Sequence, residues 1–203
     1  PSVSAGPDQT LDEGGTFTSC GAFTDPGADT WTATVDYADG SGAQTLPLNA
    51  DKAFAHSHTY ADNGTYRVTV VVDDGDGGIG TATVLVTVRN VSPLVAIEGG
   101  PTSVPEGTAI SLTSTVTDPG TLDTFTYAWS VTKDGSPYAS GTDPAFVFTP
   151  NDNGSYVVTL VVTDDDGGSG SDSESISVTN VDPALTGVSA APSTVAENES
   201  VTL

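Results

Sequence analysis

Two stretches of this chain are near copies of each other: residues 62–78 read DNGTYRVTVVVDDGDGG, and residues 152–168 read DNGSYVVTLVVTDDDGG. In each copy apolar and polar residues alternate, and a period of two is typical of a β-strand with one buried face. Each copy then ends in aspartates and glycines, which favour tight turns. The pair predicts the same strand and acidic turn at two places in the chain.

The repetition extends well beyond these stretches. LDEGGTFT at 11–18 matches VPEGTAISL at 104–112 and VAENESVTL at 195–203, and FTDPG at 23–27 matches VTDPG at 116–120. The segment VTVRNVSP at 86–93 likewise matches SVTNVDP at 177–183. A fixed period of about 90 residues indicates tandem structural units. We therefore predict three parts: residues 1–92, residues 93–183, and the beginning of a third repeat at 184–203.

Each unit is predicted to be all-β. Tyr66, Val68, Val70 and Val72 share one strand face, and Tyr156, Val158, Leu160 and Val162 repeat this pattern in the second copy. No segment keeps a helical period, and Gly, Pro, Asn and Asp interrupt the apolar runs at short intervals. About seven strands in some ninety residues is typical of an immunoglobulin-like two-sheet sandwich. The fold class is thus a tandem pair of seven-stranded β-sandwiches.

The composition is strongly acidic, with 27 Asp and Glu against 4 Lys and Arg and a formal net charge of -23. This balance argues against nucleic acid and anionic lipid as partners, because both require clustered basic residues. No stretch is long and apolar enough to be a membrane span. The single cysteine, Cys20, excludes an intrachain disulfide. Cations are the partners that this charge favours.

The sequence resembles PKD domains. VDYADG at 35–40 is similar to the family's W-D-F-G-D-G motif, with Ala38 where the family usually has Gly, and HTYADNGTYRVTVVVDD at 58–74 is similar to its H-x-Y…G-x-Y-x-V-x-L-x-V-x-D stretch. The second unit has SVTKDG at 130–135 and no His, so its membership follows from the repeat. The resemblance implies β-sandwich modules of extracellular or cell-surface proteins, several kinds of which bind calcium. The acidic motifs also loosely resemble those of cadherin repeats.

Loop order predicts where the carboxylates gather. Successive connections of a sandwich lie at alternate ends, so the lower end of the first unit and the upper end of the second face each other across a short linker. Bunched carboxylates repel one another unless a cation compensates, and calcium takes about 6–8 oxygen ligands in flexible geometry. The candidate ligands of this first junction are Glu13, Asn90, Asp118, Asp123, Asp164 and Asp166. Glu106, Asn180 and Asp182 are the candidates for the next junction, and Asp25, Asp74 and Asp76 for a preceding one.

Simpler interpretations apply to several residues. Loop order places Asp62 at the same end as Glu13, but Asp62-Asn63-Gly64 is favoured as a plain turn. Any of the acidic turns could be solvated without metal. His56 and His58 share a strand face, but His58 is expected to pack beside Tyr60 rather than bind metal. Cys20 is predicted to face outward. No recurring triad or buried acid pair indicates catalysis, so the sequence favours a protein that is not an enzyme.

The favoured function is a structural or adhesive segment of a long extracellular repeat protein, a stalk or surface fibre stiffened by Ca²⁺. Its expected partners are neighbouring repeats, with other copies in a fibre or a cell-surface ligand as further candidates. One alternative is a polysaccharide- or protein-binding accessory module of a secreted hydrolase or adhesin. Trp31 and Trp129 would form a platform for it if they were exposed, but a Trp on this strand of a sandwich is expected to be in the core. Another is a filament subunit that exchanges a terminal strand with its neighbour.

Overall fold

The computed structural model describes residues 1–184, and its regular elements are all β-strands. The predicted third repeat, apart from its first residue, lies outside the described residues. Unit one contains β1 Ser2–Ser4, β2 Gln9–Asp12, β3 Thr16–Thr24, β4 Thr32–Asp36, β5 Gln44–Thr45, β6 Ala53–Thr59, β7 Gly64–Asp73 and β8 Ile79–Arg89. Unit two contains β9 Leu94–Glu98, β10 Ser103–Pro105, β11 Ile110–Thr117, β12 Phe125–Lys133, β13 Ser136–Gly141, β14 Ala145–Phe148, β15 Gly154–Asp164 and β16 Ser169–Thr179.

Each unit is a sandwich of a three-stranded and a five-stranded sheet, which confirms the predicted fold class. In unit one the strand orders are β1-β3-β6 and β2-β8-β7-β4-β5, and in unit two they are β14-β11-β9 and β10-β16-β15-β12-β13. Among residues 1–184, no helix is long and apolar enough to cross a membrane.

The first strand of each sandwich is broken in two, so each unit has eight strands rather than seven. β1 pairs antiparallel with β3 in the smaller sheet, whereas β2 pairs parallel with β8 in the larger one. Gly6, at φ 90°, and Pro7 lie at the break, where the chain changes sheets. In unit two β9 pairs with β11 and β10 pairs parallel with β16. The acidic segment that follows β2 or β10 is thereby anchored beside the last strand of its unit.

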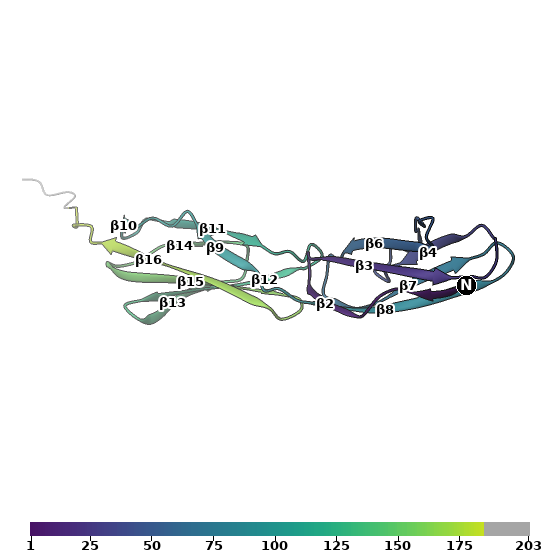
Figure 1. Ribbon diagram of the computed structural model, residues 1–203. Helices are drawn as coiled ribbons and strands as arrows, with labels where there is room; N and C mark the ends of the chain where they lie inside the picture. The colour runs from purple at the N-terminus through teal and green to yellow at the C-terminus, as the bar shows by residue number, and fades with distance from the viewer. Residues whose placement is uncertain (185–203) are drawn as a thin grey trace, which may run out of the picture.

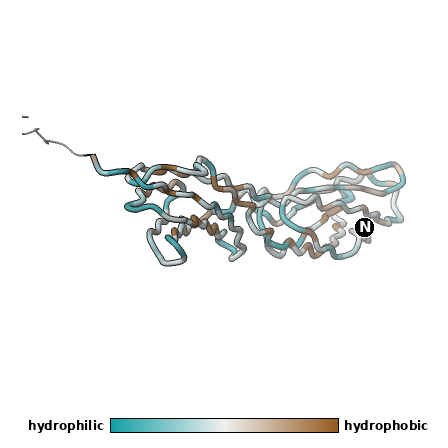
Figure 2. The backbone as a smooth tube through the Cα atoms, turned by 90° about the vertical axis from the view of Figure 1, so that its left-hand side faces the viewer, coloured by the Kyte–Doolittle hydropathy of each residue, from teal (hydrophilic) through white to brown (hydrophobic). Residues whose placement is uncertain are grey.

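Each unit has its own hydrophobic core. Val68, Val70 and Val72 of β7 are fully buried, as the alternation predicted, and so are Val158, Leu160 and Val162 of β15. Figure 2 shows the resulting interchange of hydrophobic and hydrophilic residues along the backbone. Because one face of each strand is buried, a register slip of one residue would move valines into solvent. The repeated alternation in β7 and β15 therefore fixes the register of the five-stranded sheet in the same way in both units.

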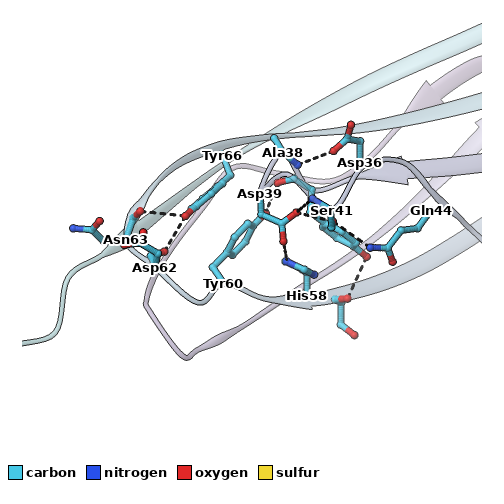
Figure 3. Close-up of polar contacts among 12 residues, drawn as sticks. Asp36, Ala38, Asp39, Ser41, Gln44, His58, Tyr60, Asp62, Asn63 and Tyr66 are labelled. Carbon is cyan, nitrogen blue, oxygen red and sulfur yellow. Dashed lines mark hydrogen bonds and ion pairs between the residues drawn. The ribbon is translucent and has the colours of Figure 1, made fainter. Parts of the chain in front are cut away.

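The VDYADG segment packs around His58 in unit one (Figure 3). The His58 ring stacks on Tyr37 with 4.1 Å between centroids, and its Nε2 lies 2.7 Å from Asp39 Oδ2. Ala38 adopts φ 61°, a left-handed conformation that favours glycine, which accounts for the glycine usual at this position. His58 also meets Tyr60 edge-on, as expected from the sequence.

The two units are arranged end to end along one axis (Figure 1). The N-terminus lies near the outer end of unit one, and the last described residues lie at the opposite end of the molecule. The connection from β8 to β9 is short, so the lower end of unit one meets the upper end of unit two. We call this meeting region the joint.

Candidate metal centre at the joint between the two units

The acidic side chains predicted to face each other come together at the joint. Unit one contributes two tight turns and the linker, and unit two contributes the long β11–β12 connection and the β15–β16 turn. The joint residues are Glu13 in the β2–β3 turn, Asp62 in the β6–β7 turn, Asn90 in the linker, Asp118 and Asp123 in the β11–β12 connection, Asp164 at the end of β15 and Asp166 in the following turn.

Glu13 is the most deeply buried acid of the joint, with a relative exposure of 2%. Its Oε1 accepts a hydrogen bond of 2.7 Å from the backbone N–H of Val91, and its own N–H donates to the carbonyl oxygen of Arg89. Its Oε2 is buried and has no hydrogen-bond partner within residues 1–184. A buried charged oxygen without a donor is costly, so this atom is suited to a cation ligand.

Asp118 and Asp123 approach Glu13 from unit two. Asp118 Oδ1 accepts a hydrogen bond from the N–H of Gly120 and so braces its turn, while Oδ2 is buried without a partner. Both carboxylate oxygens of Asp123 are buried without a partner. One ligand atom from each of Glu13, Asp118 and Asp123 lies within 4.8 Å of the others. The three residues thus form a carboxylate group that spans the joint.

Asp164 organises the turn and the linker. Its Oδ1 accepts hydrogen bonds from the N–H groups of Asp166 and Gly168, at 3.0 and 2.7 Å. Its Oδ2 accepts one of 3.1 Å from Asn90 Nδ2, which leaves Asn90 Oδ1 buried without a partner. Asp164 is absent from the close carboxylate groups of the described residues. Its position fits a bracing role, and Asn90 offers the free oxygen.

Asp62 belongs to the joint, although its sequence favoured a plain turn. The turn is present: the Tyr66 hydroxyl donates to the carbonyl oxygens of Asp62 and Asn63, at 3.0 and 3.1 Å (Figure 3). The Asp62 carboxylate also forms a second close group with Asp123 and Asp166. The turn chemistry of D-N-G hid this residue, whereas loop order already placed it at the same end as Glu13.

Backbone contacts hold the two ends together. The N–H of Leu122 donates to the carbonyl oxygen of Ala61 across the joint, at 3.3 Å. Gly14, at φ 69°, lies against Pro119 so closely that a Cβ on this glycine would be 2.7 Å from the proline Cβ. The two ends therefore fit each other in shape, which keeps the carboxylates at a short and defined separation.

The electrostatics of the joint are unfavourable without a cation. Burial, together with Glu13, Asp118, Asp62 and Asp164, raises the pKa of Asp123 to about 6. Burial also raises the pKa of Glu13, against the hydrogen bond from Val91 and with the help of neighbouring acids. Among residues 1–184, no basic group forms an ion pair with a joint carboxylate. The oxygen-only donor set suits a hard divalent cation such as Ca²⁺, whereas zinc prefers His and Cys.

The outer end of unit one carries a partial version of the same arrangement. Asp25, Asp29 and Asp74 form a close group, and the terminal ammonium of Pro1 lies 2.9 Å from Asp25. That ammonium, with the N–H of Gly27, lowers the pKa of Asp25. Asp76, a predicted ligand, donates its N–H to Asp74 but lies outside the close group.

Asp29 was missed by sequence reasoning. Asp29 is followed by a threonine and an aromatic residue, as Asp123 is in unit two. Aligning DTW at 29–31 with DTF at 123–125 therefore identifies it.

The outer end of unit two repeats the setting of Glu13. Glu106 Oε1 accepts a hydrogen bond of 2.9 Å from the N–H of Val181, just as Glu13 accepts one from Val91. Asn180 Nδ2 donates to Asp182 Oδ1, at 3.2 Å. In the described part of the chain, Glu106 and Asp182 belong to none of the close carboxylate groups.

The counterpart of Asp62 in unit two is neutralised. Asp152 lies at the matching place of the repeat, and its carboxylate is 2.6 Å from Lys133 Nζ. The hydrogen bond from Lys133 lowers the pKa of Asp152. The carboxylate at this turn is thus paired with a basic group in unit two, whereas in residues 1–184 Asp62 of unit one forms no such pair.

Other side chains noted in the sequence occupy structural positions. His56 is buried among aromatic rings, and burial lowers its pKa. Cys20 is exposed and free, as predicted. Trp129 is buried, and Trp31 is half-buried with Lys52 Nζ 4.0 Å from its ring centroid. Neither indole provides the exposed face that a carbohydrate platform would need.

Comparisons with known proteins agree with the architecture. The family model described as PKD domain matches residues 1–88 and again residues 90–179. No curated protein matches the chain. Fibronectin(III)-like modules of Clostridium thermocellum CbhA are 17% identical, with a TM-score of 0.38, over 92% of this chain and 100% of that one. The Yersinia pseudotuberculosis adhesin InvE is 16% identical, with a TM-score of 0.43, over 86% of this chain and 58% of that one.

A third similar structure is the amphioxus IgVJ-C2 molecule. It is 16% identical, with a TM-score of 0.47, over 83% of this chain and 99% of that one. These three likenesses are distant and carry no functional argument. The family match is different in kind, since it covers both units almost from end to end, with a motif segment packed around His58 and a repeated strand and acidic turn. The chain therefore belongs to the PKD domain family, of which it contains two tandem copies.

Proposed function

We propose that this chain is a non-catalytic spacer of a long extracellular repeat protein, a stalk or surface fibre, whose joint is stiffened by Ca²⁺. The single observation that carries the proposal is the set of buried oxygens without hydrogen-bond partners at the joint. These are Glu13 Oε2, Asn90 Oδ1, Asp118 Oδ2 and both carboxylate oxygens of Asp123. Since buried polar atoms are nearly always paired, so many free acceptors in one place favour a bound cation.

The mechanism follows from the origin of the ligands. Glu13 and Asn90 belong to unit one and its linker, whereas Asp118 and Asp123 belong to unit two. A cation bound to both sets prefers the end-to-end arrangement over any bent one. A ligand shifts a conformational equilibrium by its difference in affinity for the two states, so calcium would populate the straight form. Without the ion, repulsion between carboxylates would loosen the joint.

Small-angle scattering of the chain tests this proposal. The radius of gyration should rise, and the spread of shapes should narrow, when calcium replaces chelator. The melting temperature should rise in parallel, because the ion binds the folded joint but not the unfolded chain. Magnesium should be less effective at equal concentration, since it requires stricter octahedral geometry. The proposal fails if calcium changes neither the shape nor the melting temperature.

A further inference from the structure

The carboxylates of the joint form two groups that share one residue. Glu13, Asp118 and Asp123 make the first group, and Asp62, Asp123 and Asp166 make the second. Within each group the ligand atoms lie within 4.8 Å of one another. We propose that the joint holds two divalent cations of the calcium class, an inner and an outer one, bridged by the carboxylate of Asp123. This inference rests on the proposed function, which requires only one ion.

The inner position is defined by buried oxygens that have no other role. Glu13 is 2% exposed, its Oε1 is already occupied by Val91, and its unpartnered Oε2 belongs to a side chain that points into the first group. Asp118 likewise has Oδ1 occupied by Gly120 and Oδ2 free. Each residue therefore has one oxygen for a cation. Because this site is buried, water competes little with its carboxylate oxygens. The inner ion should therefore bind more tightly than the outer one.

Asp123 is the residue that links the positions. Both of its oxygens are buried, and neither has a hydrogen-bond donor among the described residues. A carboxylate that serves a single ion in monodentate fashion would leave one oxygen buried and unpaired. Bidentate binding to one ion would use both oxygens, but it would not explain why Asp123 belongs to both close groups. A bridging carboxylate uses one oxygen for each ion and accounts for both observations.

The outer position is more open. Asp166 is exposed, and Asp62 is half-buried in a turn fixed by the Tyr66 hydroxyl. Calcium commonly completes its coordination with water, so an exposed position remains suitable for it. We expect the outer ion to bind more weakly than the inner one.

The charge of the joint also favours two ions. Its six carboxylates carry a formal charge of −6, and none is paired with a basic group in residues 1–184. One divalent ion would leave −4, with Asp62 and Asp166 still facing each other. Two ions would leave −2, which coordinated water and the N–H donors of the turns accommodate more easily.

The experiment counts calcium ions on the whole 203-residue chain by native mass spectrometry and calorimetric titration. The double variant Asp62→Asn/Asp166→Asn should bind one ion fewer than the natural chain and keep the tighter binding step. In the described residues neither carboxylate accepts a hydrogen bond, and Asp62 and Asp166 bond only through their backbone, so this variant should fold. Glu13→Gln, which can keep the bond from Val91, should instead lose the tighter step.

Asp152→Asn/Asp76→Asn is the matched control, because it changes the corresponding turn positions away from the joint. It should leave the binding steps of the joint unchanged. If Asp62→Asn/Asp166→Asn binds as many ions as the natural chain while Glu13→Gln loses one, the outer ion is refuted and the one-ion joint stands. If neither variant changes the number bound, both the second ion and the proposed function are overturned.

Discussion

At the scale of single residues, the joint depends on a few atoms with unusual surroundings. Asp123 brings two unpartnered oxygens into a region already occupied by Glu13 and Asp118. Its pKa of about 6, against an ordinary value of 3.8, reflects burial first and neighbouring acids second. Gly14 contributes in a different way, since it lets Pro119 approach the backbone of unit one. The charge of the joint acids and the shape of the contact at Gly14 can therefore be changed independently, by different substitutions.

The raised pKa of Asp123 makes the metal-free protein sensitive to pH. A carboxyl group whose folded-state pKa is raised stabilises the fold below its ordinary pKa, and that stability is lost as pH rises through the folded value. We expect the melting temperature without divalent cations to fall as the pH rises from about 4 to about 6, between the ordinary and the folded-state pKa of Asp123. Asp123→Asn should flatten this dependence, as measured by calorimetry. An equally steep dependence in the variant would assign the effect to other groups.

Gly14→Ala tests the fit between the two ends. The alanine would have to adopt the left-handed φ of Gly14, which costs roughly 1–2 kcal/mol. Its Cβ would also collide with Pro119. We expect a lower stability of unit one and a weaker calcium response, measured by calorimetry and scattering.

Gly107→Ala is the control for that change. Gly107 has φ 78°, but its Cβ would meet nothing within 4 Å among the described residues. It should lower the stability of unit two only by the cost of the left-handed φ, roughly 1–2 kcal/mol, without altering the calcium response of the joint. Identical responses from the two variants would show that the contact with Pro119 is unimportant.

At the scale of elements, each acidic turn is fixed by the strands that flank it. Tyr66 of β7 holds the β6–β7 turn through its hydroxyl, and Tyr156 of β15 does the same for the carbonyl oxygen of Asp152. Asp164 and Asp74 each accept two N–H groups of the turn that they begin. The repeated sequence thus encodes a rigid turn in which one carboxylate oxygen braces the backbone. The second oxygen of Asp164 accepts the Asn90 amide, whereas Asp74 belongs to the close group with Asp25 and Asp29.

Tyr66→Phe should weaken the joint through its turn. Loss of one hydroxyl hydrogen bond costs about 1 kcal/mol of unit one's stability. It should also reduce calcium affinity, because Asp62 is no longer held in place. Calorimetric titration would measure this change. Tyr156→Phe removes the matching bond in unit two and should destabilise it without changing calcium binding at the joint, so equal affinities in the two variants would contradict the prediction.

Much of the fold and part of the joint were predictable from sequence. The period of two in β7 and β15 predicted the buried valines, and loop order predicted which acids share an end. Asp62 was discounted because a D-N-G turn needs no ligand to explain it, and Asp29 because its match to Asp123 includes a one-residue gap. The split first strand was unforeseen, since short edge strands of three or four residues carry too little alternation to detect.

At the scale of the whole molecule, the two units are independent sandwiches joined by a few polar contacts. Their cores do not merge, because each buries its own set of valines and aromatic residues. The relative position of the units therefore depends on the linker, the contact of Gly14 with Pro119 and the joint acids. An ion at this place would control shape without changing either fold.

Lengthening the linker should uncouple the units. Insertion of Gly-Ser-Gly-Ser between Ser92 and Pro93 leaves every candidate ligand in the chain. The longer linker would no longer hold the ends of the two units together. We expect each core to remain folded, while the calcium-induced rise in melting temperature and the change in radius of gyration are lost. Circular dichroism would confirm folding. A calcium response that survives the insertion would mean that binding occurs within one unit.

The parallel pairing of β2 with β8, and of β10 with β16, has a mechanical consequence. The chain enters each unit through β1 or β9, continues directly into the first strand of the parallel pair, and leaves the unit through the second. A pull along the long axis would drag the two strands in opposite directions. Such a load would shear all bonds of the ladder at once instead of unzipping them singly, so each sandwich is built to resist tension.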